Sequence, residues 1–172
     1  MASLWLHAVE TLATAIADLP GYRTAATLHT VGDVAVFIGA QVDEENAPGD
    51  DTRYVVIGFG GPPDRPGTSG QFRQTRGPLD PTTHPRDETA EIRVRLVVQR
   101  GSGTVIEAAR EVEGILGDVE GVLRVDPSLG IAVPTSRRFV AELTGSGAWS
   151  LRQTVSGPEA IIDCAVSYSA RI

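Results

Sequence analysis

Lysine is absent from the sequence, and cysteine occurs only once. All 15 basic residues of the 172-residue chain are arginine, whose guanidinium group makes several directed hydrogen bonds and tolerates protein interfaces well. The single cysteine, Cys164, excludes an intrachain disulfide, so we expect a reducing, cytosolic setting. No apolar run approaches the roughly 20 residues of a membrane-spanning helix. Residues 1–5 lack the basic region and cleavage site of a secretory signal, so we expect no leader.

The chain is acidic, with a net charge of −7. Such a charge repels phosphates on average, so conventional nucleic-acid binding is disfavoured. Five carboxylates cluster in the sequence, at Asp43, Glu44, Glu45, Asp50 and Asp51. Their spacing does not match a calcium-binding loop. We expect a solvated acidic loop or a charged surface that faces a channel or a partner.

The first half of the chain predicts one helix, two strands and a long loop. Apolar residues three and four apart predict a helix over residues 4–19, capped by Ser3 and ended by Pro20 and Gly21. Two runs that are apolar on both faces, residues 34–42 and 54–59, predict central strands. Residues 60–89 are rich in glycine and proline and show no periodicity, which predicts an extended loop or arm.

The second half predicts a strand, a helix and a strand meander. Residues 91–100 alternate as a strand, and the next helix starts at Thr104 with a Thr104–Glu107 capping box and ends at Gly117. Three antiparallel strands are predicted over residues 139–143, 149–155 and 160–168, with a tight turn at 145–147. The chain is therefore predicted to be a single α+β domain over residues 1–172. We expect a mostly antiparallel β-sheet packed against two helices, with one long Gly/Pro-rich loop.

No catalytic or metal-binding group is identifiable. His7, His29 and His84 are scattered, and none has a second ligand at metal spacing. Cys164 lies on the apolar face of a predicted strand without a base to activate it. No Gly-x-Ser-x-Gly elbow is present. We therefore predict no catalytic residue, no metal and no cofactor, and we do not expect an enzyme.

The strand-to-helix turn at residues 101–104, Gly-Ser-Gly-Thr, keeps one alternative open. Backbone amides at such a helix start can hold a phosphate. However, the dinucleotide fingerprint needs a third glycine where Ile106 stands, and the phosphate-loop lysine is missing. A turn followed by a helix cap is favoured, and a small nucleotide- or ligand-binding protein remains an alternative.

Arginines provide the candidate interface residues. Arg93 and Arg95 share one face of the strand over residues 91–100, either as an exposed face with salt bridges or as a face pressed against an acidic neighbouring copy. The predicted loop raises the same question with four more arginines, Arg65, Arg73, Arg76 and Arg86.

Three segments carry a resemblance to a known family. They are residues 8–21, which begin AVE and end ADLPG, residues 91–110, which contain EIRVRL and AAR, and residues 161–168, IIDCAVSY. With the order of predicted elements, they make the chain resemble the tail terminator subunits of long-tailed bacteriophages, a family that includes minor tail proteins of actinobacterial phages. The family has no catalytic residues to carry over.

The resemblance implies a structural virion protein at the junction of tail tube and neck, assembled in the host cytoplasm. A hexameric ring would cap the tube, end its polymerisation and bind the tail tube protein and the head-completion proteins. DNA would pass through the channel without specific binding, which suits an acidic chain. The long loop would be an arm to a neighbour, and an exposed edge strand could join copies. A head-completion or tail-tube protein of the same particle is the alternative.

Overall fold

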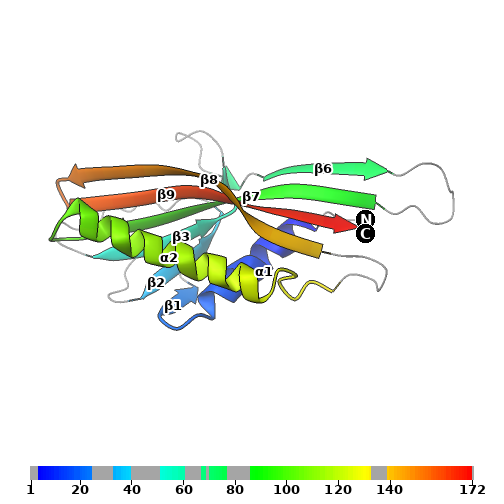
Figure 1. The fold of residues 1–172 in the computed structure, drawn as a ribbon, viewed down its shortest axis with the longest axis horizontal. Coiled ribbons are helices and arrows are strands. Elements are labelled where there is room, and N and C mark those ends of the chain that lie inside the picture. Colours follow the sequence, from blue (N-terminus) through cyan, green and yellow to red (C-terminus); the bar gives the residue numbers. More distant parts are fainter. Residues whose placement is uncertain are drawn as a thin grey trace.

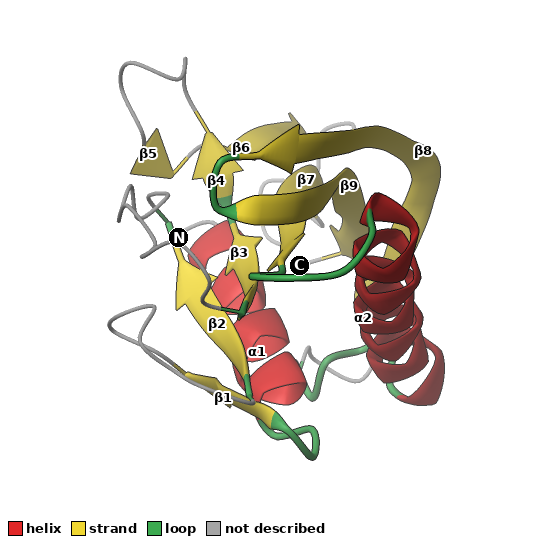
Figure 2. Ribbon diagram, turned by 90° about the vertical axis from the view of Figure 1, so that its left-hand side faces the viewer, coloured by secondary structure: helices red, strands yellow, loops and turns green. Residues whose placement is uncertain are grey.

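The computed structural model describes residues 4–24, 33–39, 51–60, 67–68, 70–76, 86–132 and 139–171. Helices α1 (Trp5–Ala17) and α2 (Val105–Val125) pack on one side of a curved, mostly antiparallel sheet (Figure 2), which confirms the predicted α+β class. The strands are β1 (Tyr22–Thr24), β2 (Val34–Ile38), β3 (Thr52–Ile57), β4 (Phe59–Gly60), β5 (Gly67–Thr68), β6 (Gly70–Arg76), β7 (Arg86–Gln99), β8 (Phe139–Thr154) and β9 (Gly157–Arg171). Neither described helix is long and apolar enough to cross a membrane.

Strand β7 lies at the centre of the seven-stranded sheet (Figure 1). The strand order is β1-β2-β3-β7-β9-β8, and β6 also pairs with β7. On one side, β7 pairs with β9 from Asp87↔Arg171 to Gln99↔Glu159. On the other side, the first half of β7 pairs with β6 and the second half with β3. The β1–β2 and β2–β3 pairs are parallel, and the other described pairs are antiparallel.

Residues 60–89 contain strand structure that the sequence did not predict. Strand β6 runs antiparallel to β7 from Gly70↔Ile92 to Arg76↔Arg86, and β7 itself begins at Arg86. The described part of the predicted loop or arm, at residues 60, 67–68, 70–76 and 86–89, is therefore paired strand. Residues 61–66, 69 and 77–85 lie outside the described residues. The sequence of β6, GQFRQTR, has one large apolar residue. Backbone pairing forms this strand without the apolar alternation that would have revealed it.

The predicted three-strand meander at the C-terminus is wrong, because β8 and β9 form one long hairpin. The expected turn at residues 145–147 is an irregularity inside β8, where the register with β9 shifts between Thr144 and Ala148. Between the pairs Thr144↔Ala165 and Ala148↔Asp163, β8 has three residues and β9 has one, and these two extra residues bend and twist the strand without reversing it. Glycine and serine in this stretch therefore mark a bulge, which composition alone does not distinguish from a turn.

Helix α2 starts as predicted and ends later than predicted. The capping box between Thr104 and Glu107 is confirmed. The helix continues past Gly117 to Val125, and its buried stripe continues with Val119 and Leu123. A glycine in a helix interior costs about 1 kcal/mol relative to alanine. Packing of the two further buried residues outweighs that cost, since tertiary packing supplies most helix stability.

The N-terminal elements follow the sequence more closely. Helix α1 begins after Leu4 and ends at Ala17, before the predicted stop at Pro20 and Gly21, while the proposed cap Ser3 lies outside the described residues. Strand β2 ends at Ile38. Residues 40–42 of the predicted strand lie outside the described residues. The two predicted central strands, β2 and β3, are neighbours in the sheet.

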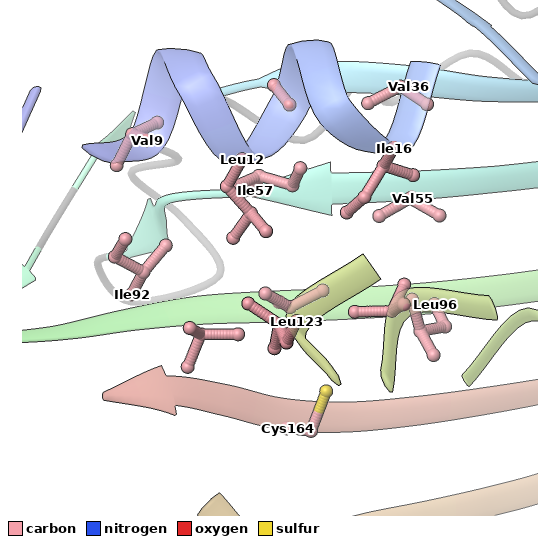
Figure 3. Close-up of a cluster of buried hydrophobic side chains, with 14 of the residues drawn as sticks. Val9, Leu12, Ile16, Val36, Val55, Ile57, Ile92, Leu96, Leu123 and Cys164 are labelled. Atoms are coloured by element: carbon pink, nitrogen blue, oxygen red, sulfur yellow. The ribbon is translucent and has the colours of Figure 1, made fainter. Parts of the chain in front are cut away.

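The core lies between the two helices and the sheet (Figure 3). Helix α1 contributes Leu12 and Ile16, and β7 contributes alternate residues such as Ile92 and Leu96. Burying each such side chain stabilises the fold by roughly 1.5–3 kcal/mol. Cys164 belongs to the same cluster, and burial raises the pKa of its thiol to about 12. A thiol with that pKa stays protonated and unreactive at neutral pH.

Candidate functional site: an exposed sheet edge

Strand β8 forms one outer edge of the sheet. Among the described strands it pairs with β9 alone, from Phe139↔Ala170 to Thr154↔Gly157. An edge strand presents a row of backbone N–H and C=O groups that can pair with another chain. The accessible part of this edge is therefore a candidate interaction surface.

The first half of β8 is covered from outside by the turn that follows α2. The N–H of Ala141 donates to the Pro127 carbonyl at 2.8 Å. The turn is held by Asp126, whose carboxylate accepts from the Ser128 N–H at 2.9 Å. Between this half of β8 and the end of α2 lies a groove of about 360 Å³, lined by Glu120, Leu123, Arg124, Pro127, Val140, Ala141, Glu142 and Leu143.

The second half of β8 is open. Every residue from 147 to 153 is exposed, and Trp149 and Leu151 keep 47% and 48% of their surface in contact with solvent. Their register partners on β9, Ile162 and Ala160, belong to the core on the helix side of the sheet. Trp149 and Leu151 therefore extend the apolar face of the sheet beyond the area that α2 covers. We refer to these two residues as the β8 apolar edge.

The open half of β8 carries no free charge that would guard it. Its one charged residue is Arg152, whose Nε and Nη2 donate to the Glu159 carboxylate at 2.7 and 2.9 Å. These bonds raise the pKa of Arg152. Soluble proteins commonly protect exposed edges with charged side chains, a proline or a β-bulge, and β8 carries its bulge at residues 145–147, before the open half. Residues 147–153 contain no lysine or proline, and their one charge is paired within the chain.

The end of this edge is fixed by a close backbone contact. Gly157 has φ +120°, and a Cβ there would lie 1.9 Å from the carbonyl oxygen of Arg100. The Arg100 N–H in turn donates to the Pro158 carbonyl at 2.9 Å. The β8–β9 turn therefore packs against the start of the connection to α2 (Figure 1). Val155 in this turn and Ile106 in the first turn of α2 are also exposed.

The two arginines predicted on β7 have different surroundings. Arg95 is half-buried, and its Nε and Nη2 donate to the Asp163 carboxylate at 2.6 and 2.9 Å across the β7–β9 pair. This pairing raises the pKa of Arg95. Arg93 is exposed. Arg93 is thus the more accessible of the two for a neighbouring molecule.

The other predicted interface arginines gather where β6 and β7 meet. Arg73 and Arg76 lie on β6, and Arg86 is the first residue of β7. The register sets Arg76 directly opposite Arg86 in the β6–β7 pair. Arg65 lies outside the described residues.

Of the five acidic residues proposed to line a channel or surface, one is described. The Asp51 carboxylate accepts a hydrogen bond from the Gly101 N–H at 2.8 Å, which ties the start of β3 to the turn before α2. The other four, Asp43, Glu44, Glu45 and Asp50, lie outside the described residues, as do His29 and His84. Within the described ranges, no three His, Cys, Asp or Glu side chains come together to hold a metal ion.

Two backbone N–H groups of the turn at residues 101–104 already donate to carboxylates of the chain. The Thr104 N–H donates to Glu107 Oε2 at 2.8 Å, and the Gly101 N–H is bonded to Asp51. These bonds from Thr104 lower the pKa of Glu107, so the group is ionised at neutral pH. A phosphate would have to displace two carboxylates and would be repelled by both. The geometry favours the turn and cap over an anion site.

One buried polar residue was missed in the sequence. Glu88 is fully buried, and its Oε1 accepts from the Leu4 N–H at 3.0 Å and from the Tyr168 hydroxyl at 2.6 Å. The signal was present, because Glu88 shares the spacing of two with the buried residues Ala90 and Ile92. It would have been found by extending the predicted strand from residue 91 back to residue 86.

No family model matches the chain, and no curated protein matches it. The geometry of this surface combines an open strand edge, two exposed apolar side chains and no free guarding charge.

Proposed function

We propose that the chain is a structural subunit of a bacteriophage tail, without catalytic activity, which assembles into a ring. The ring caps the tail tube, ends its polymerisation and joins the tail to the head–neck proteins. The observation that supports an assembly role most directly is the β8 apolar edge. Exposed aromatic and aliphatic residues on an unpaired strand are typical of surfaces that another chain completes.

The charge of the chain supports the same function. DNA must slide through a tail without being held, and a chain with net charge −7 repels phosphates on average. Asp51, the described member of the acidic group, is exposed. The channel of the ring would therefore be a passage for DNA and not a binding site.

The test has two stages. The molar mass of the purified chain is measured by light scattering across concentration, alone and with polymerising tail tube protein, and tube lengths are measured by electron microscopy. A ring mass and shortened, capped tubes are the expected results. A stable monomer that leaves tube length unchanged would contradict the proposal.

The second stage locates the subunit in the assembled particle. One ring between tube and neck is the expected position. Many stacked rings would identify a tail-tube protein, and a ring on the head side of the junction would identify a head-completion protein. Both would retain the structural role while assigning it to a different layer of the particle.

A further inference from the structure

The open half of β8 has the features of a strand that pairs with its own copy. It is bounded at one end by the register shift between Thr144 and Ala148 and at the other by the turn after Thr154. Residues 147–153 between these limits are all exposed, and Ser150 is their midpoint. A two-fold axis perpendicular to the sheet reverses the direction of a strand, so such an edge can pair antiparallel with itself.

The backbone groups of Trp149 and Leu151 point away from β9. The Pro158 carbonyl accepts the Arg100 N–H at 2.9 Å, so Pro158 directs its backbone towards β7. The direction alternates along a strand, so Ile162 also points to β7. Ile162 is the register partner of Trp149, and this pair therefore exchanges no hydrogen bonds. Trp149 and, two residues further, Leu151 thus present N–H and C=O groups at the outer edge.

A two-fold axis at Ser150 uses the whole of residues 147–153. It sets Trp149 opposite Leu151 of the second copy, and Leu151 opposite Trp149 of the second copy. Both pairs join residues whose backbone groups point outward, so each pair can exchange two N–H···O=C bonds. Moving the axis to a neighbouring residue would leave part of the open half unpaired. The limits of the open half therefore favour this register.

The side chains match in the same register. A two-fold axis perpendicular to the sheet keeps each face on its own side, so Trp149 and Leu151 of both copies gather on the helix side. Cross-strand pairs of an aromatic and an aliphatic side chain stabilise a sheet. Arg152 would lie opposite Ala148 of the second copy, and its charge is already paired with Glu159. Within residues 147–153, no like charges face each other.

The other described edges fit the open half of β8 less well. Strand β1 has three residues. Strand β6 lies beside residues 86–92 of β7, whereas residues 148–152 of β8 are level with residues 95–99 of β7. Two-fold dimers are also the commonest assembly of identical chains. We propose that two copies of the chain pair antiparallel through residues 147–153 of β8, about a two-fold axis at Ser150.

This contact does not rest on the proposed ring. A two-fold contact joins two copies and closes on itself, whereas a ring needs a contact that repeats from copy to copy. The dimer is therefore a form of the free chain, in which each copy covers the β8 apolar edge of the other. The edge becomes open to a different partner only when the pair separates.

A cysteine at the two-fold axis tests the contact. In Ser150→Cys the two new thiols lie in directly opposed residues with Cα atoms about 4.5 Å apart, a spacing that suits a disulfide. Ala148→Cys is the matched control, because it is also exposed, but its two copies would lie about 14 Å apart along the strands. The native Cys164 is buried and does not compete. Under mild oxidation, Ser150→Cys should form a covalent dimer roughly tenfold faster than Ala148→Cys, or more, because pairing raises the effective concentration of its thiols.

The molar mass from sedimentation velocity separates the outcomes. A concentration-dependent dimer together with preferential cross-linking of Ser150→Cys supports the contact. Equal cross-linking rates for the two variants, or a monomer at every concentration, would overturn it. A ring mass without preferential cross-linking of Ser150→Cys would overturn this contact and leave the proposed function standing. A wild-type dimer that leaves the length of tail tubes unchanged would support the contact and contradict the proposed function.

Discussion

The hydroxyl of Tyr168 donates a 2.6 Å hydrogen bond to the fully buried carboxylate of Glu88. The same carboxylate oxygen accepts the N–H of Leu4 at 3.0 Å, so β7, β9 and the start of α1 meet at one atom. Helix α1 has no side-chain cap and no acidic residue in its first turn. Glu88 therefore supplies, from 84 residues away, the negative group that a helix N-terminus favours.

Removing the Tyr168 hydroxyl should destabilise the fold. Tyr168→Phe keeps the ring stacked on Phe139, at a centroid distance of 5.0 Å, and deletes a buried hydrogen bond. We expect a loss of about 1–3 kcal/mol in the free energy of unfolding, measured in urea. Tyr22→Phe is the matched control, because its 2.6 Å bond to Asp118 is exposed, and it should cost less than about 1 kcal/mol. Equal losses would contradict the central role of Glu88.

Replacement of two glycines by alanine should change the stability of the fold in opposite directions. Gly157→Ala puts a methyl group within 1.9 Å of the Arg100 carbonyl oxygen at a positive φ, and should cost about 3 kcal/mol or more. Gly117→Ala, in the interior of α2 with nothing within 4 Å of the new Cβ, should stabilise by about 0.5–1 kcal/mol. Thermal and urea unfolding would measure both. A tolerated Gly157→Ala would contradict the close packing of the β8–β9 turn.

The capping box predicts a specific dependence of stability on pH. Hydrogen bonds from Thr104 lower the pKa of Glu107 in the folded state, so its contribution is fully present above its unfolded pKa. As the pH falls through the folded pKa, the contribution is lost. The stability difference between the wild type and Glu107→Gln should therefore be largest near neutral pH and shrink below about pH 4. A constant difference from pH 7 to pH 3 would contradict the assignment.

The sequence predicted those elements whose residue types carry a pattern typical of the helix or strand that they form. The apolar stripe of α1, the Thr104–Glu107 cap and the alternation of Ile92, Val94 and Leu96 are each recorded in residue types. Strand β6 is different, because its polar sequence pairs through backbone groups that every residue type has. The continuity of β8 through residues 145–147 could not be predicted either, since glycine and serine suit a bulge and a turn equally.

The candidate site likewise combines residues that can be selected by their chemistry with contacts that depend on the whole fold. Arginines could be selected as interface candidates from their chemistry, but the bond from Arg95 to Asp163 depends on the β7–β9 register. Trp149 and Leu151 read as ordinary inward-facing residues of a strand. Their exposure depends on β8 lying at the edge of the sheet, beyond the reach of α2, and sheet order is a property of the whole fold.

Truncation of Trp149 should separate assembly from folding. About half of this side chain is already exposed in the isolated chain, so Trp149→Ala should change the free energy of unfolding by about 1 kcal/mol or less. Self-association should weaken by roughly thirtyfold, because a tryptophan at the centre of an interface commonly contributes about 2 kcal/mol or more. Sedimentation velocity over a concentration series measures the association, and urea unfolding measures the fold.

Leu6→Ala is the matched control, since Leu6 on α1 is similarly exposed, at 55%, and lies outside the β8 apolar edge. It should leave self-association unchanged, whereas Leu151→Ala should weaken it in the same direction as Trp149→Ala. If Leu6→Ala and Trp149→Ala reduced association equally, the effect would reflect surface hydrophobicity in general. Assembly would then not depend on the edge of β8, and the contact between copies would have to lie on another surface of the chain.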